Sequence, residues 1–134
     1  AIEHYATIAE HLDRWGYPKL AEFYRGEAEE ERGHLKLVVG RLEYFDTQVD
    51  YAHAAPSWPR HDFVGILRAN LSLEDAAASA ERENVLVSRA AGDERSALVF
   101  AELLGGSEGS IREIEAAQRV ISEIGVDNYL ANQT

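Results

Sequence analysis

A glutamate and a histidine three residues apart are the side chains of this chain best suited to binding a metal. Glu31 and His34 form a Glu-x-x-His motif inside the acidic stretch Glu-Ala-Glu-Glu-Glu-Arg-Gly-His at residues 27–34. Residues three apart on an α-helix lie on one face, one turn apart, so both side chains can reach the same ion. The motif alone is a weak signal, because a chain rich in Glu also produces it as an exposed helix pair.

The position of Glu31 strengthens the metal interpretation. Apolar residues around it recur at alternating steps of three and four, which predicts one long helix over about residues 19–45 with a single apolar face. That face consists of Tyr24, Ala28, Leu35, Val38, Leu42 and Phe45. Glu31 falls on the same face. A carboxylate buried there must be hydrogen-bonded, paired with a cation or bound to metal.

A second carboxylate lies within another apolar stripe. A third helix is predicted over about residues 61–91, and Glu74 falls between Leu71 and Ala78 on its apolar face. Glu81 lies near the same face one heptad further on, so the pattern leaves open which of the two is innermost. Glu74 is nevertheless the second candidate metal ligand.

Breakers and caps separate the remaining elements. The first helix is predicted over residues 1–15 and ends at Gly16-Tyr17-Pro18. It begins in mid-pattern at Ala1, so we expect further helical residues upstream. A fourth helix is predicted over about residues 94–124, with a kink or loosening at its glycines 105, 106 and 109. A short fifth helical turn is predicted at residues 126–130, after Gly125.

The connection between the second and third helices is the only long one. Residues 46–59 show no periodicity and contain Pro56 and Pro59, which is typical of a crossover rather than a compact loop. Four long helices with one long crossover predict an all-α fold, a four-helix bundle with a short fifth C-terminal helix. We find no fixed-period repeat and no heptads continuing through the loops, which disfavours a helical repeat or an extended coiled coil. Residues 1–134 are therefore expected to form a single domain.

Composition excludes several classes of function. The formal net charge is -11, which argues against nucleic acid or an anionic membrane as partner and favours attraction of cations. The chain has no Cys, so disulfides, thiolate metal sites and Cys nucleophiles are absent. We find no signal-like segment, no long uncharged apolar run, no phosphate-binding Gly-rich loop and no Ser/His/Asp set. These features predict a soluble, cytoplasmic protein.

With these residues in place, the sequence resembles the bacterioferritins of the ferritin superfamily. The resemblance extends over essentially the whole chain at constant spacing and is carried by a few motifs. These are Tyr5, Trp15-Gly16, Glu31-x-x-His34, the stretch from Leu67-Arg68 to Glu74, and the tail Ile124-Gly125-Val126-Asp127-Asn128-Tyr129-Leu130. The tail is the most diagnostic, because it implies the short last helix of 24-subunit shells. Smaller 12-subunit ferritin-like proteins usually lack it.

The resemblance implies a ligand set for two irons inside the helical bundle. Glu31 would be the bridging carboxylate, His34 a terminal ligand to one iron, and Glu74 a ligand to the other. Tyr5 would be the tyrosine beside the metals, although its spacing alone is also that of an ordinary core residue. The first-helix glutamate of the family would lie upstream of Ala1. Such a subunit would bind and oxidise iron(II), and the assembled shell would store iron(III).

Two positions depart from the family pattern. The fourth-helix Glu-x-x-His of the family reads Ser107-Glu108-Gly109-Ser110, so serines stand at both ligand positions. The methionine that holds haem between paired bacterioferritin subunits is replaced by Arg32, whose guanidinium is no axial ligand for iron. We therefore expect an incomplete diiron centre and no haem held in the family manner.

Three functions remain open at the level of sequence. The first is an iron-storage shell subunit of the bacterioferritin type, with ferroxidase activity if the diiron centre is functional. The second is a structural shell subunit that relies on another subunit type for iron(II) oxidation. The third is a smaller ferritin-like oxidase or peroxide scavenger, which the tail disfavours.

Overall fold

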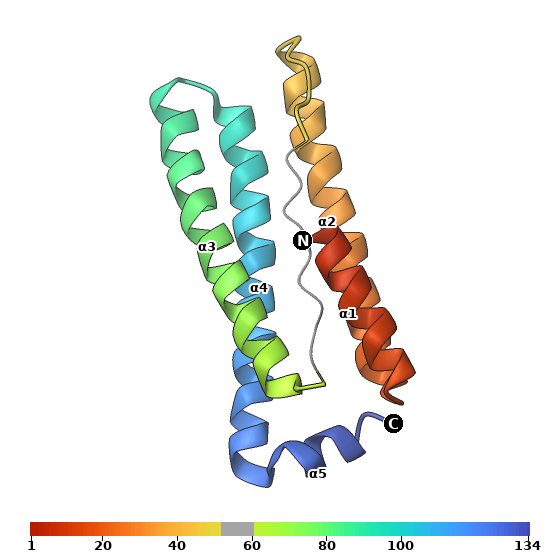
Figure 1. Cartoon of the computed structure of the whole chain (residues 1–134). Helices are drawn as coiled ribbons and strands as arrows, with labels where there is room; N and C mark the ends of the chain where they lie inside the picture. Colours follow the sequence, from red (N-terminus) through yellow and green to blue (C-terminus); the bar gives the residue numbers. More distant parts are fainter. Residues whose placement is uncertain (52–60) are drawn as a thin grey trace. The chain divides into compact units, whose positions relative to one another are not determined.

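The computed structural model describes residues 1–51 and 61–134 of the chain. All regular structure in these residues is helical, and no strand occurs in them. The elements are α1 (Ile2–Arg14), α2 (Pro18–Tyr44), α3 (Phe63–Ala90), α4 (Glu94–Ile124) and α5 (Val126–Ala131) (Figure 1). Each predicted helix is thus confirmed, to within about two residues at its ends. Most of the predicted crossover, including His53, lies outside the described residues.

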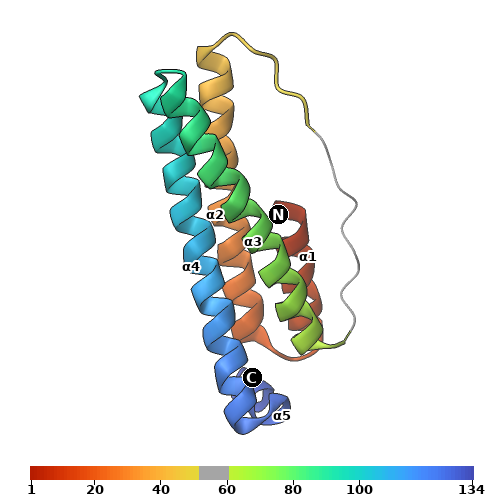
Figure 2. The same cartoon turned by 90° about the vertical axis from the view of Figure 1, so that its left-hand side faces the viewer.

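The described chain divides into two compact units. Residues 1–61 and 126–134, with α1, α2 and α5, make up one unit, and residues 62–125, with α3 and α4, make up the other. In each unit two long helices run antiparallel as a hairpin, which can be followed in Figures 1 and 2. The two units are described separately below.

A tight turn joins α1 to α2. Gly16 has φ 92°, a left-handed conformation that favours glycine, and Pro18 stands in the first turn of α2, where its missing N–H costs nothing. The C-terminal segment belongs to the same unit. The backbone N–H of Lys19 donates to the carbonyl of Gln133 at 3.4 Å, and its ammonium donates to the carbonyl of Asn132 at 3.4 Å. The end of the chain therefore satisfies donors at the start of α2.

The buried residues of α2 lie only in its first half. The side chains buried in α1 and α2 are Tyr5, Ile8, Ala9, Leu12, Leu20, Ala21, Tyr24 and Ala28. Two members of the predicted apolar face are instead exposed, Leu35 by 39% and Phe45 by 53%. The apolar face predicted for α2 is therefore covered along its first half, and these two residues of its second half are exposed.

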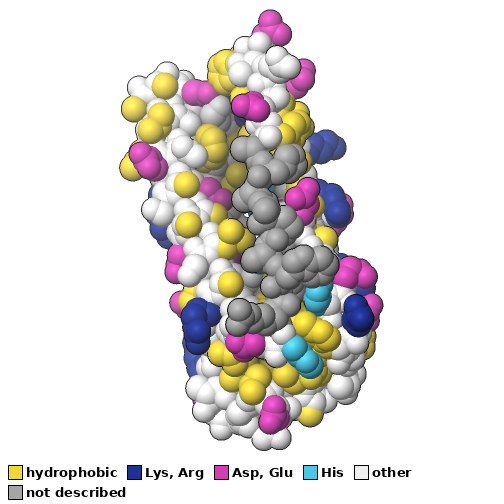
Figure 3. Space-filling view, viewed as in Figure 1, with side chains coloured by type: hydrophobic (Ala, Val, Ile, Leu, Met, Phe, Trp, Pro, Cys, Tyr) yellow, Lys and Arg dark blue, Asp and Glu magenta, His cyan; other side chains and the backbone are white. Residues whose placement is uncertain are grey.

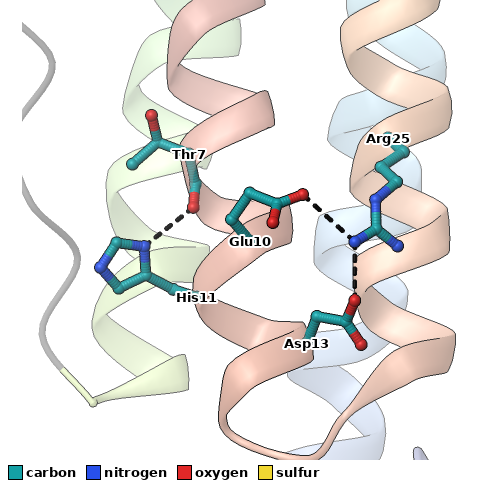
Figure 4. Close-up of polar contacts among 5 residues, drawn as sticks. All are labelled: Thr7, Glu10, His11, Asp13 and Arg25. Carbon is teal, nitrogen blue, oxygen red and sulfur yellow. Dashed lines mark hydrogen bonds and ion pairs between the residues drawn. The ribbon is translucent and has the colours of Figure 1, made fainter.

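An arginine on α2 joins the two helices at their exposed edge. The guanidinium of Arg25 lies 2.7 Å from an oxygen of Asp13 and 3.2 Å from an oxygen of Glu10 (Figure 4). The hydrogen bonds to Asp13 and Glu10 raise the pKa of Arg25 above its ordinary value. Because the pKa of Arg25 is raised in the folded protein, its contribution to stability is present at neutral pH and is lost as the pH rises through the folded-state pKa.

Both helices of the second unit begin at an aspartate cap. The carboxylate of Asp62 accepts a hydrogen bond from the N–H of Gly65, and that of Asp93 accepts one from the N–H of Ser96, both at 3.0 Å. Such caps satisfy donors that have no partner within the helix itself. Gly92, with φ 74°, makes the short turn between α3 and α4.

The buried face of the second unit is unusually polar. Its apolar members are Phe63, Ile66, Leu67, Ala78, Val85, Ala97 and Ile114, and its polar members are Asn70, Glu74, Ser88, Ser96 and Ser107. Leu71 of the predicted stripe is only half-buried, as are the predicted core residues Phe100, Leu104, Ile111 and Ile121 of α4. Contrary to the predicted loosening at its glycines, α4 is a single unbroken helix. Several of the buried residues of α3 and α4 are therefore small, among them Ala78, Ser88, Ser96, Ala97 and Ser107.

Acidic side chains are spread out on the face of the molecule that is drawn in Figure 3, rather than gathered in one patch. Within the described ranges, no helix is both long enough and apolar enough to cross a membrane.

Candidate metal centre

The predicted Glu-x-x-His motif forms a close pair on α2. Nδ1 of His34 lies 3.3 Å from Oε1 of Glu31, as the i, i+3 spacing requires. Both side chains are largely covered, with 15% of the His34 side chain and 27% of the Glu31 side chain exposed. The structure therefore brings these two side chains together, and their role as metal ligands stays a prediction.

The separation of the two atoms fits shared coordination. Two donors that each lie about 2.1 Å from one ion are roughly 3.0–3.4 Å apart when the angle at the ion is octahedral or tetrahedral. The observed distance of 3.3 Å falls in that range. An imidazole nitrogen and a carboxylate oxygen are also suitable donors for iron, zinc or manganese. The pair can thus supply two ligands without rearrangement.

A second carboxylate approaches the same imidazole. Oε1 of Glu30 lies 3.8 Å from Nε2 of His34, and the Glu30 side chain is 50% exposed. In the sequence Glu30 is one residue of the acidic stretch 27–34 and was not singled out as a candidate ligand. Its i, i+4 spacing from His34 is the signal that identifies it. The ring of His34 thus has a carboxylate near each of its nitrogens.

The predicted tyrosine is buried and stacked on a second tyrosine. Tyr5 of α1 and Tyr24 of α2 are 2% and 3% exposed, and their ring centroids lie 5.9 Å apart with an interplanar angle of 23°. This is an offset-stacked aromatic pair. Sequence reasoning treated Tyr24 only as an apolar face residue, because periodicity does not reveal which rings meet.

Glu74 is the most deeply buried carboxylate among the described residues. It is 4% exposed and belongs to α3, in the other unit of the chain. One turn before it, at i-4, Asn70 is 0% exposed. Asn70 was not predicted from the sequence. The signal that could have identified it is its i, i+4 spacing from Glu74, which places both polar residues on the same buried face of α3. Of the two candidates on α3, Glu74 is more buried than the half-buried Glu81.

The first of the two α4 serines contacts the other acidic residue. Ser107 is 5% exposed, and its hydroxyl donates a hydrogen bond of 3.2 Å to Oε1 of Glu81 on α3. An exposed pair flanks this contact, with Arg82 3.7 Å from Glu108. Ser110 is half-buried. Ser107, at a ligand position of the family, therefore hydrogen-bonds to the carboxylate of Glu81 and supplies no carboxylate of its own.

Arg32, at the position of the family's haem ligand, forms an ion pair on the surface of α2. Arg32 pairs with Glu29 at 2.8 Å, and 53% of the Arg32 side chain is exposed. Across residues 1–51 and 61–134, His, Asp and Glu side chains form no group of three or more that could hold a metal ion. Glu31 and His34 are brought together, whereas Glu74 belongs to the other unit, so the full ligand set stays a prediction.

Comparison with known proteins identifies the protein family of this chain. Residues 1–124 match the family model described as the ferritin-like domain. The chain therefore belongs to the ferritin superfamily, and its helices together with this match confirm the predicted all-α, ferritin-like fold.

Within that class, the curated relatives are bacterioferritins. The chain is 28% identical to the bacterioferritin of Brucella melitensis biotype 1 over 129 residues, which cover 96% of this chain and 80% of the relative. It is 28% identical to that of Streptomyces coelicolor over 131 residues, covering 98% and 78%. For the bacterioferritin of Mycobacterium avium the identity is 23% over 131 residues, covering 98% and 82%. The resemblance to bacterioferritins is thus confirmed, and iron storage is the function that this family supports.

Proposed function

We propose that this chain is an iron-storage shell subunit of the bacterioferritin type, which binds iron within its helices and holds ferric mineral in the assembled cavity. Glu31 and His34 are the primary iron ligands, and Glu74 is the ligand from α3. Iron is the cargo, and identical or related subunits in a 24-mer are the partners. We place the protein in the cytoplasm and expect neither haem held through Arg32 nor binding to nucleic acid or membranes.

The Glu31–His34 pair is the observation that carries this proposal. The 3.3 Å separation of its donor atoms and the partial burial of both side chains suit a metal ligand pair better than an exposed helix pair. Partial burial matters because it removes water that would otherwise compete for the ion. The family membership supports iron as the ion.

Metal titration of the purified, assembled protein tests the proposal. Cobalt(II) is a suitable probe, because its optical spectrum reports the coordination geometry and it does not oxidise in air as iron(II) does. We expect binding with a spectrum of nitrogen and oxygen ligands, and a loss of affinity in Glu31→Ala of roughly ten- to a hundredfold or more, since a direct ligand is removed. Glu43→Ala, on an exposed face of α2, is the matched control and is expected to bind normally. Binding that is unchanged in Glu31→Ala would refute the site.

A second candidate function is favoured by the contact of Ser107. Ser107 and Ser110 stand at the family's two ligand positions on α4, so α4 presents no carboxylate–imidazole pair there, and the hydroxyl of Ser107 instead donates to Glu81. In this alternative the chain is a structural shell subunit, and a different subunit type oxidises iron(II). Gel filtration with mass spectrometry, followed by iron loading, discriminates between the two. A homogeneous 24-mer that mineralises iron unaided contradicts the alternative, whereas an assembly that mineralises only with added catalytic subunits supports it.

A further inference from the structure

The imidazole of His34 lies between two carboxylates of its own helix. Its Nδ1 is 3.3 Å from Oε1 of Glu31, and its Nε2 is 3.8 Å from Oε1 of Glu30. Only 15% of the His34 side chain is exposed, so its ring nitrogens have limited access to water, and the two carboxylates influence where the ring carries its hydrogen. The proposed iron ligands use one side of this ring, and the other side faces Glu30.

A metal can bind only one tautomer of this ring at Nδ1. A neutral imidazole carries one hydrogen, on either Nδ1 or Nε2, and the nitrogen without the hydrogen is the one that can bind a metal. For His34 to share an ion with Glu31, the lone pair must be on Nδ1, because Nδ1 is the nitrogen beside the Glu31 carboxylate. The hydrogen is then on Nε2, on the side of the ring where Glu30 lies.

The carboxylate of Glu30 favours this tautomer. A negative oxygen near Nε2 stabilises a hydrogen on that nitrogen, whereas the carboxylate of Glu31 favours a hydrogen on Nδ1 in the metal-free protein. The observed 3.8 Å is longer than a hydrogen bond. The Glu30 side chain is 50% exposed, so it has room to move the remaining distance to an ordinary length of about 3.0 Å.

We propose that Glu30 is a positioning residue of the metal site, which accepts a hydrogen bond from Nε2–H of His34 and thereby presents Nδ1 to the ion. This inference rests on the proposed iron-binding function. A carboxylate that accepts the second N–H of a ligating imidazole fixes the tautomer and the orientation of the ring. Loss of such a carboxylate typically lowers metal affinity by about 10- to 100-fold.

The opposite arrangement would place the ion at Nε2 beside Glu30, with Nδ1–H donating to Glu31. Burial and distance favour the first arrangement. The Glu31 side chain is 27% exposed against 50% for Glu30, and its oxygen is the closer of the two to the ring. Water therefore competes less for an ion on the Glu31 side.

The chain offers a matched set of variants. Glu30→Ala removes the acceptor, and Glu30→Gln keeps an amide oxygen that can accept the same hydrogen bond without the charge. Glu29→Ala is the control, because Glu29 is 75% exposed and pairs with Arg32 at 2.8 Å. It removes the same charge one residue away. A general attraction of cations by negative charge would therefore weaken binding equally in both alanine variants.

Cobalt(II) titration of the assembled protein measures the effect on affinity. We expect Glu30→Ala to bind about tenfold more weakly than wild type, at the lower end of the usual range because Glu30 is half exposed. Glu30→Gln should recover part of this loss, and Glu29→Ala should bind as wild type does. Equal losses in the two alanine variants, or a glutamine variant as weak as Glu30→Ala, would overturn the inference.

Nitrogen-15 magic-angle-spinning NMR of the assembled, ¹⁵N-histidine-labelled protein reads the tautomer directly. Spectra are taken at alkaline pH, so that the ring is neutral, and His34 is assigned from the signals missing in His34→Gln. In the zinc-loaded wild type we expect a metal-bound Nδ1 and a protonated Nε2. In metal-free Glu30→Ala the share of the Nε2–H tautomer should fall below that of wild type. A metal-bound Nε2, or an unchanged tautomer share, contradicts the positioning role.

The titration also separates this inference from the function on which it rests. If cobalt binding depends on Glu31 but Glu30→Ala behaves as Glu29→Ala does, Glu30 has no positioning role and the iron-binding proposal stands. If cobalt binding does not depend on Glu31, the iron-binding proposal fails and the role of Glu30 fails with it.

Discussion

Removing the hydroxyl of Ser107 tests whether its contact with Glu81 stabilises the hairpin of α3 and α4. In Ser107→Ala the carboxylate of Glu81 loses a donor at 3.2 Å in a largely covered environment. Hydrogen bonds to charged groups contribute about 1.5–3 kcal/mol. The observed distance is longer than the 2.5–3.0 Å usual for hydroxyl donors. We therefore expect a loss near the lower limit, about 1.5 kcal/mol.

Urea unfolding followed by circular dichroism is the appropriate assay, at one fixed protein concentration because assembly also contributes to stability. The midpoint should fall with an unchanged slope, which indicates a change in stability rather than in the surface exposed on unfolding. Ser122→Ala is the control, because Ser122 lies on the same helix and its hydroxyl bonds only to the exposed carbonyl of Arg119. It should change stability by less than about 0.5 kcal/mol. If Ser107→Ala is no less stable than Ser122→Ala, the hydrogen bond contributes nothing and the reasoning is wrong.

Three further predictions concern the fold. A Cβ on Gly65 would lie 2.5 Å from Oδ2 of Asp62, the residue that caps α3, so Gly65→Ala should cost up to about 1 kcal/mol of stability. When Gly65→Ala is made in a protein that already carries Asp62→Ala, the clash is gone and the change should be neutral or stabilising. A urea double-mutant cycle measures this coupling, and simple additivity would contradict it. Leu12 is 0% exposed, so Leu12→Ala should lose about 2–5 kcal/mol in the same assay, and a smaller loss would mean that the site collapses around the cavity. Arg25→Met should lower the melting temperature slightly at low salt but not at about 1 M salt, where exposed charges are screened, and a salt-independent difference would contradict the ion-pair explanation.

Much of the fold could be predicted because its signals are local. The turn at Gly16 and Pro18, the cap at Asp93 and the termination at Gly125 each depend on neighbouring residues, and the helix ends agree with them to within about two positions. The extent of burial could not be predicted in the same way. Leu35 lies on the predicted apolar face and is 39% exposed, because periodicity identifies a face of α2 but does not say how far along the helix a neighbouring element covers that face.

In the candidate site, too, contacts within one helix could be predicted, whereas contacts between helices could not. The Glu31–His34 contact was predictable because it requires only that one helix forms. The stacking of Tyr24 on Tyr5 and the hydrogen bond from Ser107 to Glu81 join residues of different helices, 26 positions apart in the second case. Periodicity identifies the face on which such a residue lies, but the partner depends on the register between two helices. That register is set by packing and cannot be read from either helix alone.

The contact between Ser107 and Glu81 also constrains how this chain could change over evolutionary time. Regaining the glutamate of the bacterioferritin pattern at position 107 would bring a second carboxylate close to Glu81, where like charges and shared burial disfavour the ionised pair. Glutamate at position 107 is therefore expected to be tolerated better when residue 81 is uncharged. Ser107→Glu should unfold at lower urea than Ser107→Glu/Glu81→Gln, and the opposite order would contradict this expectation. One hydrogen bond thus couples the residue types that positions 81 and 107 accept, so a change at one position alters which changes the other tolerates.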